Sequence, residues 1–297
     1  MPEPAGAEGA DSSPSGEILD AHCHAWRHWP YPPPVPDALG RGTLGQLVYE
    51  MDLNGVAEAV IVCAGIEANP DNLGYVTAEV GHHPGRFHVL ADLDCPWSTT
   101  YHLPGSADRL RALADEYKLV GFTHYLDEDN DGWLAGDEAE ALFSLAAERG
   151  LVASLAVGPA WQADLRRLAL RHPEVAVLCH HLGDLRSGDS DGLAELLASA
   201  AVPNIYVKAS GFHYASGRAW DAPWPDALGL LRRIVDAYGP NRLCWGSDFP
   251  ASKRFCTYRQ SLEAVRSHCE FLSPDEIAMV LGGTLRSILA GRRSLPG

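Results

Sequence analysis

The chain has 297 residues, of which 46% are hydrophobic and 21% are charged, so it has enough apolar side chains for a sizeable core and is not typical of a disordered protein. The 39 acidic residues outnumber the 23 basic ones, which gives a formal net charge of −16. Such a charge repels nucleic-acid phosphates and anionic lipids, so we expect neither nucleic acid nor a membrane surface as a partner.

The N-terminal segment 1–17 has neither the basic start nor the apolar stretch of a signal peptide, and it is predicted to be a disordered acidic tail. No apolar run reaches membrane-spanning length. The seven cysteines are odd in number and form no C-x-x-C pair, which favours free thiols over disulfides. These features predict a cytoplasmic protein.

From residue 18 onward, short runs rich in Val, Ile and Leu alternate with helical patterns, as in consecutive βα units. The predicted strands are 18–25, 57–64, 86–93, 119–125, 151–157, 175–182, 204–210 and 242–247. The first helix signals are Asn69 as an N-cap followed by Pro70, a start at Ser106, and "DEAEALFSLAAERG" closed by Gly150. Further helices are predicted at 160–171, 190–200, 224–238, 257–269 and 273–289. The order predicts one (β/α)8 TIM barrel over residues 18–297, with polar residues at the carboxyl ends of its strands facing the active site.

Several of these predicted strands end in polar side chains. They are His22 and His24 on the first strand, His180 and His181 on the sixth, Lys208 on the seventh and Asp248 on the eighth. Two imidazoles at i and i+2 of a strand lie side by side, and a carboxylate from across the barrel mouth completes a ligand set that suits zinc or a similar ion.

These strand ends carry the pieces "DAHCH", "HHLG", "VKASG", "GSDFP" and "VLGG", in this order, between residues 18 and 290. In this ordered set the chain resembles the amidohydrolase superfamily, specifically its amidohydrolase-2 branch, which often has "DHLG" in place of "HHLG". The resemblance implies that Asp248 is both a metal ligand and the general base that takes a proton from water. It also implies that His181 is the inward-facing histidine that polarises a substrate carbonyl, while strand alternation would turn His180 to the other face.

The chain departs from this family at two positions. Metal-dependent members usually add a histidine on strand 5, or a lysine or glutamate on strand 4, whereas strand 5 here offers only Ser154. Thr123 stands where many lactonase-like members carry an arginine that grips a substrate carboxylate. The shortage of ligands is similar to the lactonase subgroup, whose members can work without a metal. Two alternatives stay open: one divalent ion, zinc or manganese, or metal-free operation with His22 and His24 on the substrate carbonyl.

The long loops 26–43 and 95–106 are rich in aromatic residues and are expected to roof a pocket for an apolar or aromatic substrate. The predicted substrate-binding residues are Lys208, His124, Tyr125, His180, Trp26, Trp97 and Tyr101, with His28 and His102 as further site-lining candidates.

Residues 127–138, "DEDNDGWLAGDE", match an EF-hand calcium loop, with Asp127, Asp129, Asp131 and Glu138 as ligands. The alternative is an acidic surface turn in which Asp137 caps the following helix together with Glu140.

The resemblance thus favours a hydrolase that opens a lactone or a related cyclic carbonyl compound. The first alternative is metal-dependent decarboxylation of unsaturated or aromatic acids, a reaction known in the same branch. The second is a non-catalytic barrel that binds a small molecule or calcium. The sequence leaves the oligomeric state open, a homo-oligomer included.

Overall fold

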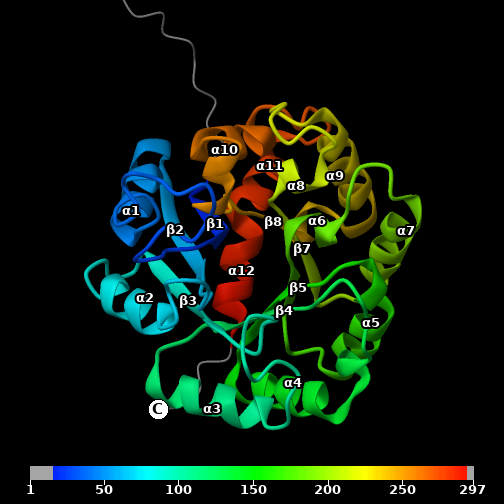
Figure 1. The fold of residues 1–297 in the computed structure, drawn as a ribbon. Coiled ribbons are helices and arrows are strands. Elements are labelled where there is room, and N and C mark those ends of the chain that lie inside the picture. Colours follow the sequence, from blue (N-terminus) through cyan, green and yellow to red (C-terminus); the bar gives the residue numbers. More distant parts are fainter. Residues whose placement is uncertain (1–15, 293–297) are drawn as a thin grey trace, which may run out of the picture.

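The computed structural model describes residues 16–292, and the predicted tail lies outside this range except for its last two residues. Eight parallel strands form one sheet in the order β1 to β8, curled into a nearly closed barrel (Figure 1). The strands are Ile18–Cys23, Val56–Val62, Phe87–Asp92, Gly121–Tyr125, Val152–Ala156, Val177–Cys179, Ile205–Ala209 and Leu243–Trp245. All eight predicted strands and the TIM-barrel architecture are therefore confirmed.

Helices surround the sheet on its outer face. They are α1 (Leu44–Asn54), α2 (Asn72–Val80), α3 (Ser106–Glu116), α4 (Asp137–Arg149), α5 (Gln162–Arg171), α6 (His181–Asp184), α7 (Ser190–Ala198), α8 (Phe212–Ala215), α9 (Pro225–Tyr238), α10 (Tyr258–Arg266), α11 (Pro274–Ala278) and α12 (Thr284–Gly291). No helix of residues 16–292 is both long and apolar enough to cross a membrane.

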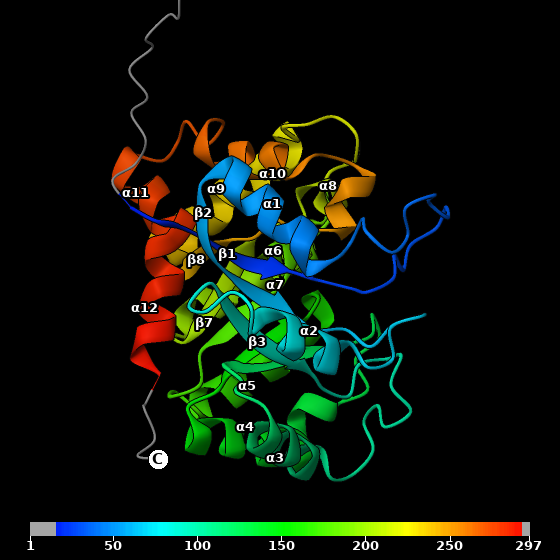
Figure 2. The same ribbon diagram turned by 90° about the vertical axis from the view of Figure 1, so that its left-hand side faces the viewer.

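The two ends of the barrel differ. At the end where the strands begin, Leu285 and Ile288 of α12 pack with the apolar side chains that fill the barrel, such as Leu19 and Leu178. In Figure 2, α12 covers this end while the β1 arrow points away from it, toward the long loops. The side chains of α12 therefore close the interior of the barrel at this end.

Two predicted N-caps, Asn69 and Asp137, are wrong. Helix α2 begins at Asn72, and its N-cap is Asp71, whose carboxylate accepts a hydrogen bond from the Gly74 amide; Asn69 instead binds the backbone of His28. Helix α4 already includes Asp137, so its N-cap is Gly136 and no side chain caps it. A single sequence shows several residues able to cap, and tertiary contacts decide among them.

The barrel is closed by contacts between β1 and the segment after β8. The Asp248 amide donates to the His22 carbonyl at 2.8 Å, and the His24 amide donates to the Phe249 carbonyl at 2.6 Å. The buried Asp20 carboxylate accepts from the backbone amides of His22 and Ser247. This closure fixes the two halves of the predicted site against each other.

Candidate active site

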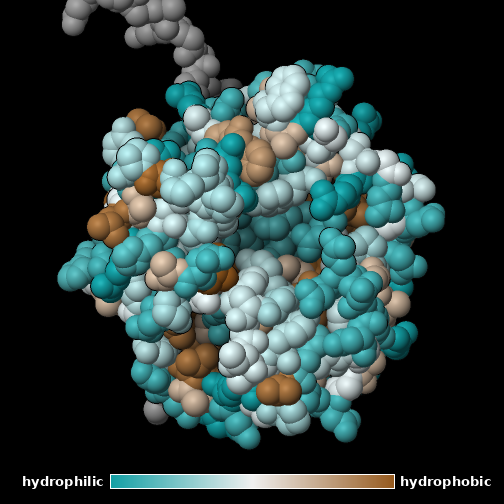
Figure 3. Space-filling view, in the orientation of Figure 1, coloured by the Kyte–Doolittle hydropathy of each residue, from teal (hydrophilic) through white to brown (hydrophobic). Residues whose placement is uncertain are grey.

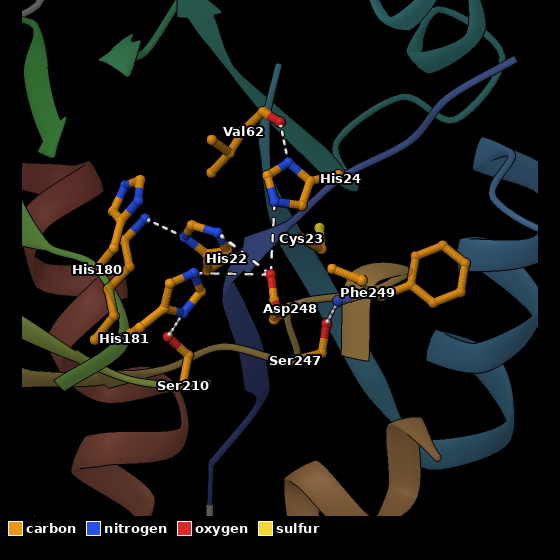
Figure 4. A network of polar contacts seen from close by, with 12 residues as sticks. His22, Cys23, His24, Val62, His180, His181, Ser210, Ser247, Asp248 and Phe249 are labelled. Atoms are coloured by element: carbon orange, nitrogen blue, oxygen red, sulfur yellow. Dashed lines mark hydrogen bonds and ion pairs between the residues drawn. The ribbon is translucent and has the colours of Figure 1, made fainter. Parts of the chain in front are cut away.

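The two histidines of β1 converge on one carboxylate oxygen. His22 Nε2 lies 3.7 Å and His24 Nε2 lies 3.6 Å from Asp248 Oδ1 (Figure 4). The register of β1 against β2 is irregular between Asp20 and Cys23, where three residues of β1 span two of β2. Such a bulge re-aims side chains at a strand end.

Asp248 lies at the centre of the cluster. His181 Nε2 approaches Oδ1 at 3.9 Å, while Oδ2 accepts a hydrogen bond from the Tyr214 hydroxyl at 2.9 Å. Asp248 and His181 both have left-handed backbones, with φ of 55° and 43°. This conformation is unfavourable for residues other than glycine, so tertiary contacts must stabilise it here. Burial raises the pKa of Asp248, but the neighbouring His181 and His24 outweigh it and bring the pKa to about 2. Asp248 is therefore a carboxylate at neutral pH.

The hydrogen bonds behind the two β1 histidines give them different tautomers. His24 Nδ1 lies 2.6 Å from the Val62 carbonyl, so it donates there and Nε2 keeps its lone pair. His22 Nδ1 lies 3.0 Å from Lys208 Nζ. A lysine ammonium can only donate, so while Lys208 is charged His22 Nδ1 accepts and its Nε2 carries the proton.

Lys208 is fully buried inside the barrel, beneath the histidines. Its Nζ also donates to Ser154 Oγ at 2.7 Å, and burial lowers the pKa of Lys208 to about 7. Lys208 therefore contacts His22 and Ser154 and does not line the open cleft, where a substrate-binding residue was predicted.

His180 does not lie on the opposite face, which corrects the expectation from strand alternation. Leu178 packs inside the barrel, so alternation along β6 points His180 inward as well, and the left-handed backbone at His181 brings the next side chain to the same cluster. The His180 ring is buried 4.4 Å from the His22 ring, and its Nε2 lies 2.7 Å from Ser154 Oγ.

A cleft of about 870 Å³ leads from this cluster to the surface. His181, Tyr125 and Tyr214 line its inner part, and residues of the loops after β4, β5 and β6 line the rest. Figure 3 shows a hollow with hydrophilic residues at the centre of this face. Tyr125 thus lies where a pocket residue was predicted.

The other predicted aromatic residues do not line this cleft. Trp26 is buried and stacks on His24, with ring centroids 4.7 Å apart, so it does not form a roof. His124 is also buried: its Nδ1 faces the Leu93 carbonyl and its Nε2 lies 3.2 Å from His102 Nε2. Its neighbour Tyr125 takes the inward position of β4, so strand alternation turns His124 outward. Tyr101 stacks on His102, away from the cluster.

Trp97 is 39% exposed and packs against Tyr125, with ring centroids 4.8 Å apart. Its indole donates to Asp92 at the end of β3. Trp97 therefore packs against Tyr125, which lines the cleft, but does not line the cleft itself.

Asp127, Asp129 and Asp131 line one pocket, but Glu138, the fourth predicted calcium ligand, does not line it. Glu138 accepts from the amides of Gly105 and Ser106 and caps α3, while Asp131 pairs with His102 at 2.6 Å. Glu140 binds Arg171 and His172 instead of capping α4. The clusters within residues 16–292 that could hold a metal lie at the barrel mouth, not in 127–138.

Two residues of the cluster escaped the sequence analysis. Tyr214 binds Asp248, and His213 Nε2 lies 3.8 Å from Asp248 Oδ2. Both follow β7 in "ASGFHYA", so the rule that polar residues after a barrel strand face the site would have found them.

The donor set at the mouth fits one divalent ion. One atom each from His22, His24 and Asp248 lie within 4.8 Å of one another, and His22 Nε2 is buried without a partner among the described residues. The two Nε2–Oδ1 distances, 3.6 and 3.7 Å, are close to the ligand separation of about 3.4 Å that zinc bonds of about 2.1 Å imply.

The chain is similar to known proteins along most of its length. The model of the amidohydrolase family matches residues 19–287. The L-fucono-1,5-lactonase of Burkholderia ambifaria is 27% identical over 289 residues, covering 89% of this chain and 92% of that protein.

Two solved structures share the fold. An amidohydrolase from Burkholderia multivorans with bound zinc gives a TM-score of 0.73 at 22% identity, covering 93% of this chain and 99% of that one. A probable 2-pyrone-4,6-dicarboxylic acid hydrolase from Acinetobacter baumannii, with citric acid bound, gives 0.74 at 17% identity, covering 92% and 99%.

Proposed function

We propose that this chain, which belongs to the amidohydrolase family and is a hydrolase, opens the ester bond of a lactone. The observation that carries the proposal is the convergence of three histidine Nε2 atoms on the Asp248 carboxylate at the inner end of the cleft. Ester hydrolysis needs a base for water and donors for the developing oxyanion, and this cluster offers both.

In the proposed reaction, Asp248 takes a proton from water as the water oxygen bonds to the lactone carbonyl carbon. His22 donates from Nε2 to the carbonyl oxygen, where negative charge develops, and Lys208 keeps that proton in place. His181 lies on the cleft side of the Asp248 carboxylate, and together with His22 it binds the carbonyl oxygen of the lactone. The ring C–O bond then breaks, and the alkoxide takes the proton from Asp248 to give a hydroxy acid.

A divalent ion held by His22, His24 and Asp248 would supply Lewis-acid polarisation of the carbonyl. Direct contact by His22 is favoured by the lysine behind it, because a charged Lys208 keeps the proton on the ring nitrogen that an ion would need.

Chelation separates these two routes. Activity that survives complete removal of metal supports direct contact, and activity that is lost and returns with zinc or manganese assigns His22 and His24 as ligands.

The test of the reaction itself uses L-fucono-1,5-lactone, after the name of the relative in Burkholderia ambifaria. Enzyme-dependent ring opening that the Asp248→Asn variant lacks supports the proposal. Release of CO2 from an aromatic acid without ring opening of any lactone would instead support the decarboxylase alternative.

A further inference from the structure

We propose that the outer part of the cleft selects neutral, polyhydroxylated lactones and rejects lactones that carry a carboxylate. This inference rests on the proposed function and concerns the part of the substrate that does not react. The comparisons leave both classes open, because one relative is named for a sugar lactone and one structural neighbour for a dicarboxylic acid.

The residues around the outer cleft are unbalanced in charge. Four carboxylates line it, against one guanidinium: Asp127, Glu128, Asp184, Asp189 and Arg186. Burial raises the pKa of Asp184 to about 7, although the neighbouring Arg186 opposes this shift, so Asp184 is only partly ionised at neutral pH. Asp189 accepts a hydrogen bond of 2.8 Å from the Gly192 amide and caps α7, so one of its carboxylate oxygens already has a partner.

The carboxylates of Asp127 and Glu128 can still accept all their hydrogen bonds from a ligand. Neither carboxylate has a hydrogen bond or ion pair with any other residue within 16–292; Asp127 is anchored by its backbone, whose amide and carbonyl bind Tyr101 and Trp161. An ionised carboxylate only accepts hydrogen bonds, and two adjacent hydroxyls of a sugar supply two donors to it. A substrate carboxylate has no proton to give and would be repelled.

Within residues 16–292, Arg186 is the only cationic residue that lines the cleft. Thr123, on β4, is fully buried, and its hydroxyl has no partner among the described residues. The guanidinium of Arg254 is held over the ring of Tyr31 at 4.3 Å, its Nε donates to the Ala251 carbonyl, and its Nη2 lies 3.5 Å from the Tyr214 hydroxyl at the inner end of the cleft. Arg254 does not line the cleft that leads to His181. The net charge of −16 adds a repulsive field for any anion that approaches.

The test compares two stable lactones that differ at one group. L-galactono-1,4-lactone carries a hydroxymethyl group where galactaro-1,4-lactone carries a carboxylate. Their dissociation constants are measured by calorimetry on the Asp248→Asn variant, which keeps the outer cleft and does not turn over. We expect the neutral lactone to bind at least about tenfold more tightly at low salt, and the ratio to shrink at 0.5 M salt because the repulsion is screened.

Adding Asp127→Asn and Glu128→Gln should bring the ratio to within about threefold, since both amides are nearly isosteric and uncharged. Adding Glu270→Gln, an exposed carboxylate outside the cleft, should leave the ratio unchanged. A ratio near one, a preference for the carboxylated lactone, or a ratio that the double substitution leaves intact would overturn the inference. Selective binding without turnover by the wild type would refute only the proposed reaction, whereas turnover of the carboxylated lactone would refute only the selectivity.

Discussion

Replacing Lys208 by methionine separates the two effects of this lysine, one on stability and one on activity. Burial lowers the pKa of Lys208 from 10.5 to about 7. The charged form is therefore disfavoured in the folded state: the resulting destabilisation is absent well above pH 10.5, grows as the pH falls, and is complete below about pH 7. From these two pKa values it amounts to about 4 kcal/mol at pH 7 and about 1 kcal/mol at pH 10.

Methionine removes this destabilisation but leaves His22 Nδ1 buried without a partner, which costs about 1–3 kcal/mol. The metal-free Lys208→Met variant should thus be more stable than the wild type by about 1–3 kcal/mol at pH 7, and should lose this advantage by pH 10. Its kcat should nevertheless fall about 10- to 100-fold, because nothing then fixes the His22 tautomer.

Urea unfolding at both pH values, together with kcat, measures the two effects, and Lys118→Met at an exposed position is the control. The reasoning would be refuted if the difference in the free energy of unfolding between Lys208→Met and the wild type did not change with pH. It would also be refuted if Lys208→Met kept the wild-type kcat.

Three further predictions concern the site and the loop beside it. Tyr214→Phe should lower kcat about tenfold with little change in KM, because it removes a charge-assisted hydrogen bond to the base; equal kcat values would exclude that role. The value of kcat/KM should stay nearly constant from about pH 6 to pH 5, because Asp248 and His181 have pKa values of about 2 and 4 and lose their unprotonated forms only below this range. It should fall as the pH rises through about 7, where Lys208 loses the charge that fixes the His22 tautomer; an acid limb near pH 6.5 would contradict the assignment. Millimolar calcium should not raise the Tm, whereas Glu138→Ala should cost about 1–2 kcal/mol as the α3 cap is lost; a calcium-dependent rise that Asp127→Ala removes would restore the EF-hand prediction.

The barrel could be predicted because its signal is local. Each strand is a short apolar run, and each is followed by a helical pattern, so order and spacing alone indicate the fold. The β1 histidines and Asp248 were found by the rule for strand ends. His213 and Tyr214 were missed because they lie four and five residues beyond the end of β7, in α8, and not at the strand end itself.

Other features depend on contacts between distant segments. His180 and His181 both reach the site because His180 faces inward like Leu178, while the left-handed backbone at His181 turns the next side chain to the same side. Glu138 caps α3 from more than 30 residues away, which a local motif cannot indicate. Trp26 is buried under His24 although its segment looks like an exposed loop.

The most direct test of the central claim is proton release during hydrolysis of L-fucono-1,5-lactone, followed with a pH indicator in weak buffer. Opening the ring yields a hydroxy acid that ionises, so each turnover releases one proton. We predict release by the wild type well above the spontaneous rate, and a drop of at least about 100-fold in Asp248→Asn with its circular dichroism unchanged. Wild-type release at the spontaneous rate, or an Asp248→Asn variant that keeps more than about a tenth of the wild-type kcat, would contradict the assignment of Asp248 as the base of a lactonase.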